Sequence, residues 1–387
     1  MNRRDFIIKN GQIMTVAMFM NFMDTTSIFA SNNNADDHKR PSLEGLVTPI
    51  LKAIALGVNA PSPHNTQSWK FKILNDTELL FYVDEHKLLP ATDPPSRQIH
   101  IGAGCFIETL AIGVTSLGYK AQVQYFPEGY ANAADFGKKP VAKIVLEKTS
   151  EPKNELSDYI SKRQTNRGVY KGEIITATEW AELLKITGVT HSKTHFINKA
   201  ADMKPYQDIF YKALEIESKT FATNEETRKM FRFSEQERAQ KRDGISIPQM
   251  GFKGMMLKLA ENSLNNGDSE KWHSAKSINA SLKNVVKGLD SSKGIILWQT
   301  DANEVMDWVK TGRDYVRFSL AATKNNFYCH PYNQAIQEYD EMKTLRQELD
   351  TLVGIKGTEK IQMIVRIGRA DEPYLSYRRE VKDYIIA

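Results

Sequence analysis

Two long apolar segments are the main hydrophobic features of the chain. The first, Ile99 to Leu117, is apolar nearly all round and ends at Gly118, so we expect a helix buried on most faces. The second, Asn303 to Asn325, repeats apolar residues at helical spacing. Patterns typical of strands flank both helices, at Phe71–Leu74, Leu79–Val83, Ala121–Tyr125, Val141–Leu146, Gly294–Gln299 and Lys360–Ile367. The pattern predicts an α+β protein, and its recurrence in both halves suggests a duplicated unit.

Shorter elements complete the predicted fold. Further helices are expected at Leu43–Val58, Thr176–Ile186 with a threonine cap, Ala201–Phe221 and Met342–Leu352, and a strand at Thr194–Ile197. The segment from Thr223 to Ser292 mixes charges of both signs, which favours a solvated helix. Its glycines and methionines between Gly244 and Met256 predict a mobile flap. We interpret the segment as an insertion that could cover a site.

The first residues have the features of an export signal. Arg3 and Arg4 stand before an apolar run, Ile13 to Met23, that lacks acidic residues and is short for a membrane span. This resembles a twin-arginine (Tat-type) signal, with a general secretory signal as the alternative. We expect a signal segment at 1–31, a polar linker at 32–41 and cleavage near Ala30. Export to the periplasm through the Tat machinery follows, with membrane tethering if the signal is retained.

Composition narrows the class of protein. The chain has 387 residues, 41% of them hydrophobic and 26% charged, which is typical of a globular protein. A net charge of +5 does not indicate a nucleic-acid binder. Cys105 and Cys329 are far apart, and we expect both to be small buried residues rather than a disulfide framework. The histidines lack the spacing of metal ligands, so no metal site is predicted.

A proline-rich loop, Ala60 to Trp69, is the first candidate site. Its two prolines exclude a helix, and Ser, His, Asn, Thr and Gln side chains follow in quick succession. The loop is either an ordinary helix-to-strand turn or a stiff ligand cradle. A Ser62–His64 hydrolase is a further alternative, but the chain has no G-x-S-x-G elbow.

A basic segment, Lys162 to Tyr170, is the second candidate. It carries Lys162, Arg163 and Arg167 among amide and hydroxyl groups. If the two arginines point the same way, they form an anion site. An exposed basic turn is the alternative.

The ordered set of motifs resembles the FMN-dependent nitroreductase superfamily, in its Acg-like branch. The loop at 60–69 resembles the PSxxNxQPW motif, and Lys162–Arg167 resembles the RRSxR segment. Gly312–Thr323, the turn at His330–Pro331, Val365–Gly368 and Arg378–Arg379 resemble the second half of that fold, so the likeness covers Ser42 to the end. Gln164 and Ser68 depart from the motifs.

The resemblance implies a nitroreductase fold in which one chain imitates a dimer, hence a monomer. The lobes would be 42–150 and 151–387, with a lid insertion at about 223–292. Only the first half has the loop and only the second has the arginine segment, so one FMN site is expected. The cofactor-binding residues implied are Pro61, Ser62, Asn65, Arg163, Thr165, Arg167, His330, Arg378 and Arg379.

The resemblance also implies an activity. The first hypothesis is hydride transfer from NAD(P)H through FMN to a nitro- or quinone-like acceptor. The resemblance implies no catalytic side chain. The alternatives are a flavin-binding or flavin-sequestering protein without turnover, and a structural protein that keeps only the fold. The lid could exclude bulky donors and acceptors. Nicotinamide donors are scarce outside the cytosol, which favours another donor or the binding role.

Overall fold

The computed structural model describes residues 38–130, 135–188, 190–264 and 267–387. The described part of the chain combines helices with two mostly antiparallel sheets, so the predicted α+β class is confirmed. The signal segment 1–31 and most of the 32–41 linker lie outside the described residues. His38–Ala387 forms one compact unit, in which the two sheets are described below.

The first sheet has the order β3-β4-β2-β1-β9. After α2 (Pro49–Gly57), the chain forms the strands β1 (Trp69–Asn75) and β2 (Glu78–Val83). The long helix α3 (Arg97–Val114) follows, and then the strands β3 (Tyr119–Tyr125) and β4 (Ala142–Lys148). A tight turn joins β1 to β2, where the Asn75 side chain accepts a hydrogen bond from Thr77 N at 2.9 Å. The predicted helix 43–58 begins only at Pro49, because Thr48 provides the N-cap.

The second sheet has the order β5-β6-β8-β7. Its elements are α4 (Ala177–Thr187), β5 (Lys193–Ile197), β6 (Gly294–Thr300), α11 (Val305–Lys324), β7 (Tyr328–Pro331), α12 (Lys343–Val353) and β8 (Lys360–Gly368). Thr176 and Glu179 form a capping box that starts α4. The expected turn at His330–Pro331 is wrong, because these residues end the edge strand β7 and pair with Arg366 and Val365.

The two sheets share one topology. Apart from α5–α10 and α12 in the second unit, each unit runs helix, strand, strand, long helix, strand, strand. Across each sheet these strands lie in the order third, fourth, second, first. The C-terminal strand β9 (Ile385–Ile386) departs from this scheme, since it crosses back and pairs in parallel with β1 of the first sheet. The chain end therefore belongs with the first unit in space, although the sequence placed it in the second lobe.

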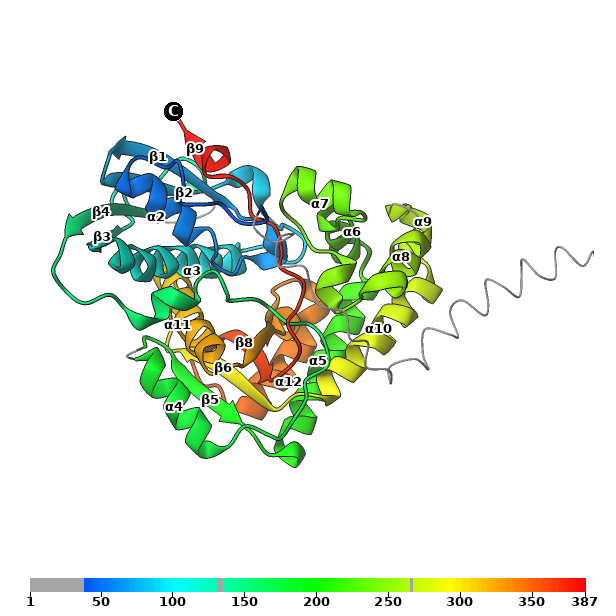
Figure 1. Cartoon of the computed structure of the whole chain (residues 1–387). Coiled ribbons are helices and arrows are strands. Elements are labelled where there is room, and N and C mark those ends of the chain that lie inside the picture. Colours follow the sequence, from blue (N-terminus) through cyan, green and yellow to red (C-terminus); the bar gives the residue numbers. More distant parts are fainter. Residues whose placement is uncertain (1–37, 131–134, 189, 265–266) are drawn as a thin grey trace, which may run out of the picture. The chain divides into compact units, whose positions relative to one another are not determined.

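The long helices α3 and α11 lie next to each other (Figure 1), and a glycine of each helix lies at their contact. A Cβ on Gly104 would lie 1.8 Å from Val309 O, and one on Gly312 would lie 1.9 Å from Ile101 O. Only glycine allows this approach. Glu108 of α3 also pairs with Arg313 and Arg317 of α11, at 2.5 and 2.6 Å. The prediction that α3 is buried on most faces is confirmed; it has the length and hydropathy of a membrane span, but 83% of that window is buried inside the protein.

Helices fill the long connection between β5 and β6. They are α5 (Ala200–Lys219), α6 (Phe221–Met230), α7 (Glu235–Lys241), α8 (Gly254–Ser263), α9 (Ser269–His273) and α10 (Ala275–Asp290). Phe231, Phe233 and Ile245 form a small core of their own there. α5 packs instead on the core of the second sheet. After α5, the described part of this connection consists of several helices rather than the one solvated helix that was expected.

Candidate functional site

The proline-rich loop leaves α2 and enters β1 through a tightly wound backbone. His64, Asn65 and Gln67 have φ values of 45°, 55° and 53°, a left-handed conformation that non-glycine residues rarely adopt. Ser62 Oγ accepts a hydrogen bond from Gln67 N at 2.9 Å, which closes the turn. Trp69 then enters the core against Phe106, with ring centroids 5.3 Å apart. Backbone strain of this kind is held in place only by surrounding contacts.

Asn65 and Arg378 supply those contacts. Arg378 donates to Val58 O, Ala60 O and Asn65 Oδ1 at 2.8, 2.9 and 2.7 Å. Asn65 Nδ2 donates to Gly244 O at 3.2 Å and Tyr377 O at 3.3 Å. Burial, and secondarily Arg163, lowers the pKa of Arg378 to about 9. The side chains of Asn65 and Arg378 are thus engaged with the protein, and both hold the loop in shape.

The arginine segment precedes α4 and lies against β7. Thr165 bridges to Cys329 of β7, and Asn166 N donates to Cys329 O at 3.3 Å. Arg163 is 3% exposed, and its Nη2 donates to Asn59 O at 3.2 Å. Its Nε and Nη1 are buried without a hydrogen-bond partner. Burial lowers the pKa of Arg163, whose neighbours Tyr315, Cys105 and Cys329 are all uncharged.

Both predicted cysteines are buried and free, as expected. The hydroxyl of Tyr315, which lies near them, also lacks a partner. Orphaned buried polar groups are rare in folded proteins, so a cluster of them marks a place where a ligand could bind.

The two candidate segments meet around Arg167. Arg167 lowers the pKa of His64 in the loop to about 4, after burial as the main cause. Together with Arg366, it also lowers the pKa of His330 on β7, again after burial. Gly102 of α3 approaches the loop as well, since a Cβ there would lie 3.0 Å from Pro63. The side chain of Arg167 has no hydrogen-bond or ion-pair partner among the described residues. The loop and the arginine segment therefore face one another.

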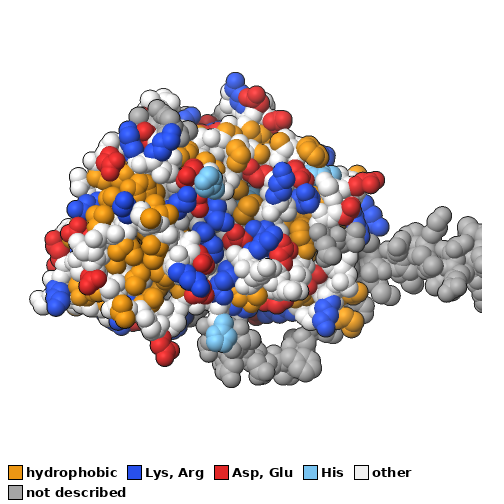
Figure 2. Space-filling model, turned by 90° about the horizontal axis from the view of Figure 1, so that it is seen from above, with side chains coloured by type: hydrophobic (Ala, Val, Ile, Leu, Met, Phe, Trp, Pro, Cys, Tyr) orange, Lys and Arg blue, Asp and Glu red, His pale blue; other side chains and the backbone are white. Residues whose placement is uncertain are grey.

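The arginines of this region differ from the other arginines in their partners. Nine arginines elsewhere in the described chain lie within 3.3 Å of a carboxylate, namely Arg97, Arg228, Arg232, Arg238, Arg242, Arg313, Arg317, Arg346 and Arg369. For Arg163, Arg167, Arg366, Arg378 and Arg379, no described carboxylate lies within ion-pair distance. A buried cation without a counter-charge is costly, so this region suits an anion. Figure 2 shows Lys and Arg side chains gathered in a band across one face.

Arg379 and Arg366 complete the set. Arg379 N donates to Gln67 Oε1 at 2.9 Å, and its guanidinium bonds Gln67 O and stacks on Tyr384. Arg366 of β8 is fully buried and contacts His330. The sequence placed Arg366 only in a motif and not in the site. The sequence signal for Arg366 was an arginine flanked on both sides by apolar residues within a strand.

The segment Arg242–Lys253 of the extra region contacts both candidate walls. Gly244 N donates to Asn65 O at 3.2 Å, and Gln67 Nε2 donates to Arg242 O at 2.9 Å. At the other end, a Cβ on Gly251 would lie 3.9 Å from Gly168 Cα, next to Arg167. The segment Arg242–Lys253 therefore contacts both the proline-rich loop and the arginine segment.

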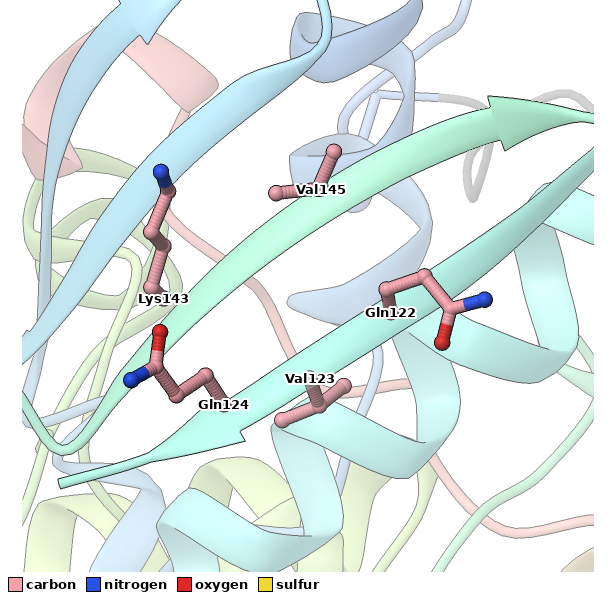
Figure 3. A pocket seen from close by; sticks show the side chains of 5 residues that line it. All are labelled: Gln122, Val123, Gln124, Lys143 and Val145. Carbon is pink, nitrogen blue, oxygen red and sulfur yellow. The ribbon is translucent and has the colours of Figure 1, made fainter. Parts of the chain in front are cut away.

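A separate surface hollow of about 260 Å³ lies over β3 and β4 (Figure 3). It is lined by Gln122, Val123, Gln124, Lys143 and Val145. Lys143 already pairs with Glu78 at 3.2 Å. The hollow contains neither of the candidate segments, and its lining offers no further charged group for chemistry.

Comparisons with known proteins give partial matches. No family model matches the chain. It is 29% identical over 123 residues to the putative NAD(P)H nitroreductase Rv3131 of Mycobacterium tuberculosis, which covers 31% of this chain and 34% of that protein. It is 31% identical over 83 residues to the putative NAD(P)H nitroreductase acg of the same organism, covering 21% and 25%. The chain thus matches about a quarter to a third of the length of these relatives.

Solved structures give weak overall matches. A nitroreductase-like protein from Bacillus cereus aligns with 12% identity and a TM-score of 0.32, over 60% of this chain and 94% of that one. A nitroreductase with bound FMN from Bacteroides fragilis aligns with 13% identity and a TM-score of 0.30, over 58% and 94%. The shared topology of the two sheets is assigned from their strand order. Over its matched segments, the chain is similar to putative NAD(P)H nitroreductases, in keeping with its motifs.

Proposed function

We propose that the chain binds FMN between the proline-rich loop and the arginine segment. The observation that carries the proposal is the group of buried and half-buried arginines without described carboxylate partners, in which Arg163 Nε and Nη1 lack hydrogen-bond partners. A phosphate dianion would supply the missing charge and several acceptor oxygens. The similarity to putative NAD(P)H nitroreductases supports a redox role for the bound group, and the motifs resemble those of the FMN-dependent nitroreductase superfamily.

The residues of the two segments suit FMN, some by binding it directly and others by holding the loop that contacts it. Arg163 and Arg167, with the hydroxyl of Thr165, would hold the phosphate, because their donors are available. Pro61, Ser62 and His330 would contact the rest of the cofactor. Asn65, Arg378 and Arg379 would not contact the cofactor directly, because protein partners occupy most of their polar atoms. Their part is to keep the strained loop in place.

We further propose a nitroreductase-like oxidoreductase. Bound FMN supplies hydride acceptance and donation, and the chain supplies binding, orientation and exclusion of water. The donor would be NAD(P)H or another small reductant, and the acceptor a nitro- or quinone-like compound. The repeated strand order of the two sheets supports a fused pair of units that imitates a dimer, hence a monomeric protein. Light scattering on the purified protein tests the monomer, and a dimer mass would contradict it.

A second candidate function is flavin holding without turnover. It is favoured by the contacts of Arg242–Lys253 with both walls, which would restrict access to the cofactor. Anaerobic mixing with NADPH separates the two functions. Bleaching of the flavin absorbance supports the oxidoreductase, whereas an unchanged spectrum supports the holding role.

Cofactor content is the first test. The purified protein should release FMN on denaturation, identified by chromatography, and the double substitution of Arg163 and Arg167 by Ala should abolish it. Arg369→Ala is the matched control, because Arg369 is paired with Glu179 on the surface. A colourless wild-type protein that ignores added FMN contradicts the proposal.

We also propose export by a twin-arginine route. Replacing Arg3 and Arg4 with lysines should retain the protein in the cytoplasm of a fractionated bacterial host. Unchanged export would instead favour a general secretory signal.

A further inference from the structure

Arg366 occupies the centre of the second sheet and connects three separate segments. Its Nη2 donates to Gly168 O and its Nη1 to Gly288 O, both at 2.7 Å. Its Nε donates to His330 Nδ1 at 3.1 Å. The guanidinium also lies 4.1 Å from the ring centroid of Tyr170. One buried cation therefore joins the turn after Arg167, the end of α10 and strand β7.

The contact with His330 follows from the sheet itself. His330 and Arg366 are direct partners in the antiparallel register of β7 and β8. Side chains of such a pair lie on the same face of the sheet, close enough to interact. The hydrogen bond between them is thus set by strand pairing and does not depend on a mobile loop.

This hydrogen bond decides the chemical form of the imidazole. An arginine guanidinium has only donors, so the atom facing it must accept. His330 Nδ1 therefore carries no proton, and the ring proton of the neutral form is on Nε2. Among the described residues, Nε2 has no hydrogen-bond partner. The ring thus offers one N–H donor beside Arg167.

Arg366 also fixes the backbone that carries Arg167. Gly168 follows Arg167 directly, and a Cβ on Gly288 would lie 3.7 Å from Arg167 O. Loss of Arg366 would remove the side-chain donor to Gly168 O, and it would leave Gly288 O with its other donor, Ser291 Oγ at 2.7 Å. The position of Arg167 would then be less restricted.

We infer that Arg366 is a positioning residue, which presents His330 to the ligand as a neutral Nε2–H donor and holds Arg167 beside it. This rests on the proposed FMN site for the identity of the ligand. The ligand atom that faces Nε2 must accept a hydrogen bond, and FMN offers carbonyl oxygens and ring nitrogens. Burial, followed by the charges of Arg366 and Arg167, lowers the pKa of His330. The ring centroid of Tyr332 lies 4.5 Å from that of His330, and burial raises the pKa of this tyrosine.

Nitrogen-15 NMR of the apo protein, labelled at histidine, tests the first part without any cofactor. His330→Gln identifies the resonances among the eight histidines. Wild type at pH 7 should show a pyridine-type Nδ1 and a pyrrole-type Nε2. Arg366→Met should give a mixture of tautomers and a titration closer to that of a free histidine, near pH 6.5. Arg366→Lys, which keeps the charge and one donor, should retain more of the wild-type signature.

Titration with FMN tests the second part. Arg366→Met should weaken FMN binding at least about tenfold, and Arg366→Lys should weaken it less. An Nδ1–H tautomer or an imidazolium in the wild-type protein at pH 7 overturns the inference, as do unchanged His330 resonances in Arg366→Met. If Arg366→Met does not fold, wild type and Arg366→Lys still decide the tautomer. A wild-type protein with the Nε2–H form but no FMN binding refutes the proposed ligand and supports only the tautomer.

Discussion

Replacing Arg163 with methionine should separate binding from stability. Arg163 is 3% exposed and makes a single side-chain hydrogen bond, to Asn59 O at 3.2 Å. Its Nε and Nη1 donors are buried and unpaired. Methionine has a similar length, fills irregular apolar space and carries no charge. The substitution removes a cation that the apo protein does not neutralise and that the proposed phosphate requires.

Arg163→Met should affect the stability of the apo protein and its affinity for FMN in different directions. Each buried unpaired donor costs about 1–3 kcal/mol, and the lost bond to Asn59 is worth about 1.5–3 kcal/mol. We therefore expect the free energy of unfolding of the apo protein to stay within about 1 kcal/mol of wild type or to rise. Losing two charge-assisted hydrogen bonds to FMN, at about 1.5–3 kcal/mol each, should weaken FMN binding by about 10²- to 10⁴-fold.

Arg378→Met is the matched comparison for this prediction. Arg378 is equally buried, but its donors are bonded to Val58 O, Ala60 O and Asn65 Oδ1. Its removal should destabilise the apo protein by several kcal/mol, because buried acceptors lose their donor. Urea unfolding of the apo proteins and fluorescence titration with FMN measure both quantities. An Arg163→Met protein as destabilised as Arg378→Met, with unchanged FMN affinity, would refute the reasoning.

Three other expectations concern the frame around the site. Gly312→Ala should lower the free energy of unfolding by about 3 kcal/mol or more, because the new Cβ would lie 1.9 Å from Ile101 O. A loss under about 1 kcal/mol in urea unfolding would contradict the close contact of α3 and α11. Burial raises the pKa of Glu217 from 4.5 to about 7, so stability is lost as pH rises from about 4.5 to 7; Glu217→Gln should be more stabilising at pH 8 than at pH 4.5, and equal effects would disprove it. Asp243→Asn weakens the ion pairs with Arg232 and Lys87 and should speed hydrogen exchange at 242–253. Unchanged exchange rates would show that these ion pairs do not hold the segment in place.

Much of the secondary structure could be predicted from local sequence patterns. The apolar run of α3, the threonine cap of α4 and the strands β1, β2, β6 and β8 are set by neighbouring residues, and they occur where expected. The edge strand β7 was missed, because four residues ending in His330-Pro331 look like a turn. The two-residue strand β9 was missed because its partner β1 is more than 300 residues earlier.

The sequence by itself indicated the two candidate segments, the buried cysteines and the duplicated order of elements. These follow from residue type and spacing, which act over a few neighbouring positions. Only the tertiary structure showed that Asn65 and Arg378 bind each other, that Arg366 faces His330, and that no described carboxylate pairs with the arginines of this region. Charged and hydrogen-bonding groups interact only when they lie close together in space. In this fold the interacting groups come from strands and loops that lie far apart along the chain.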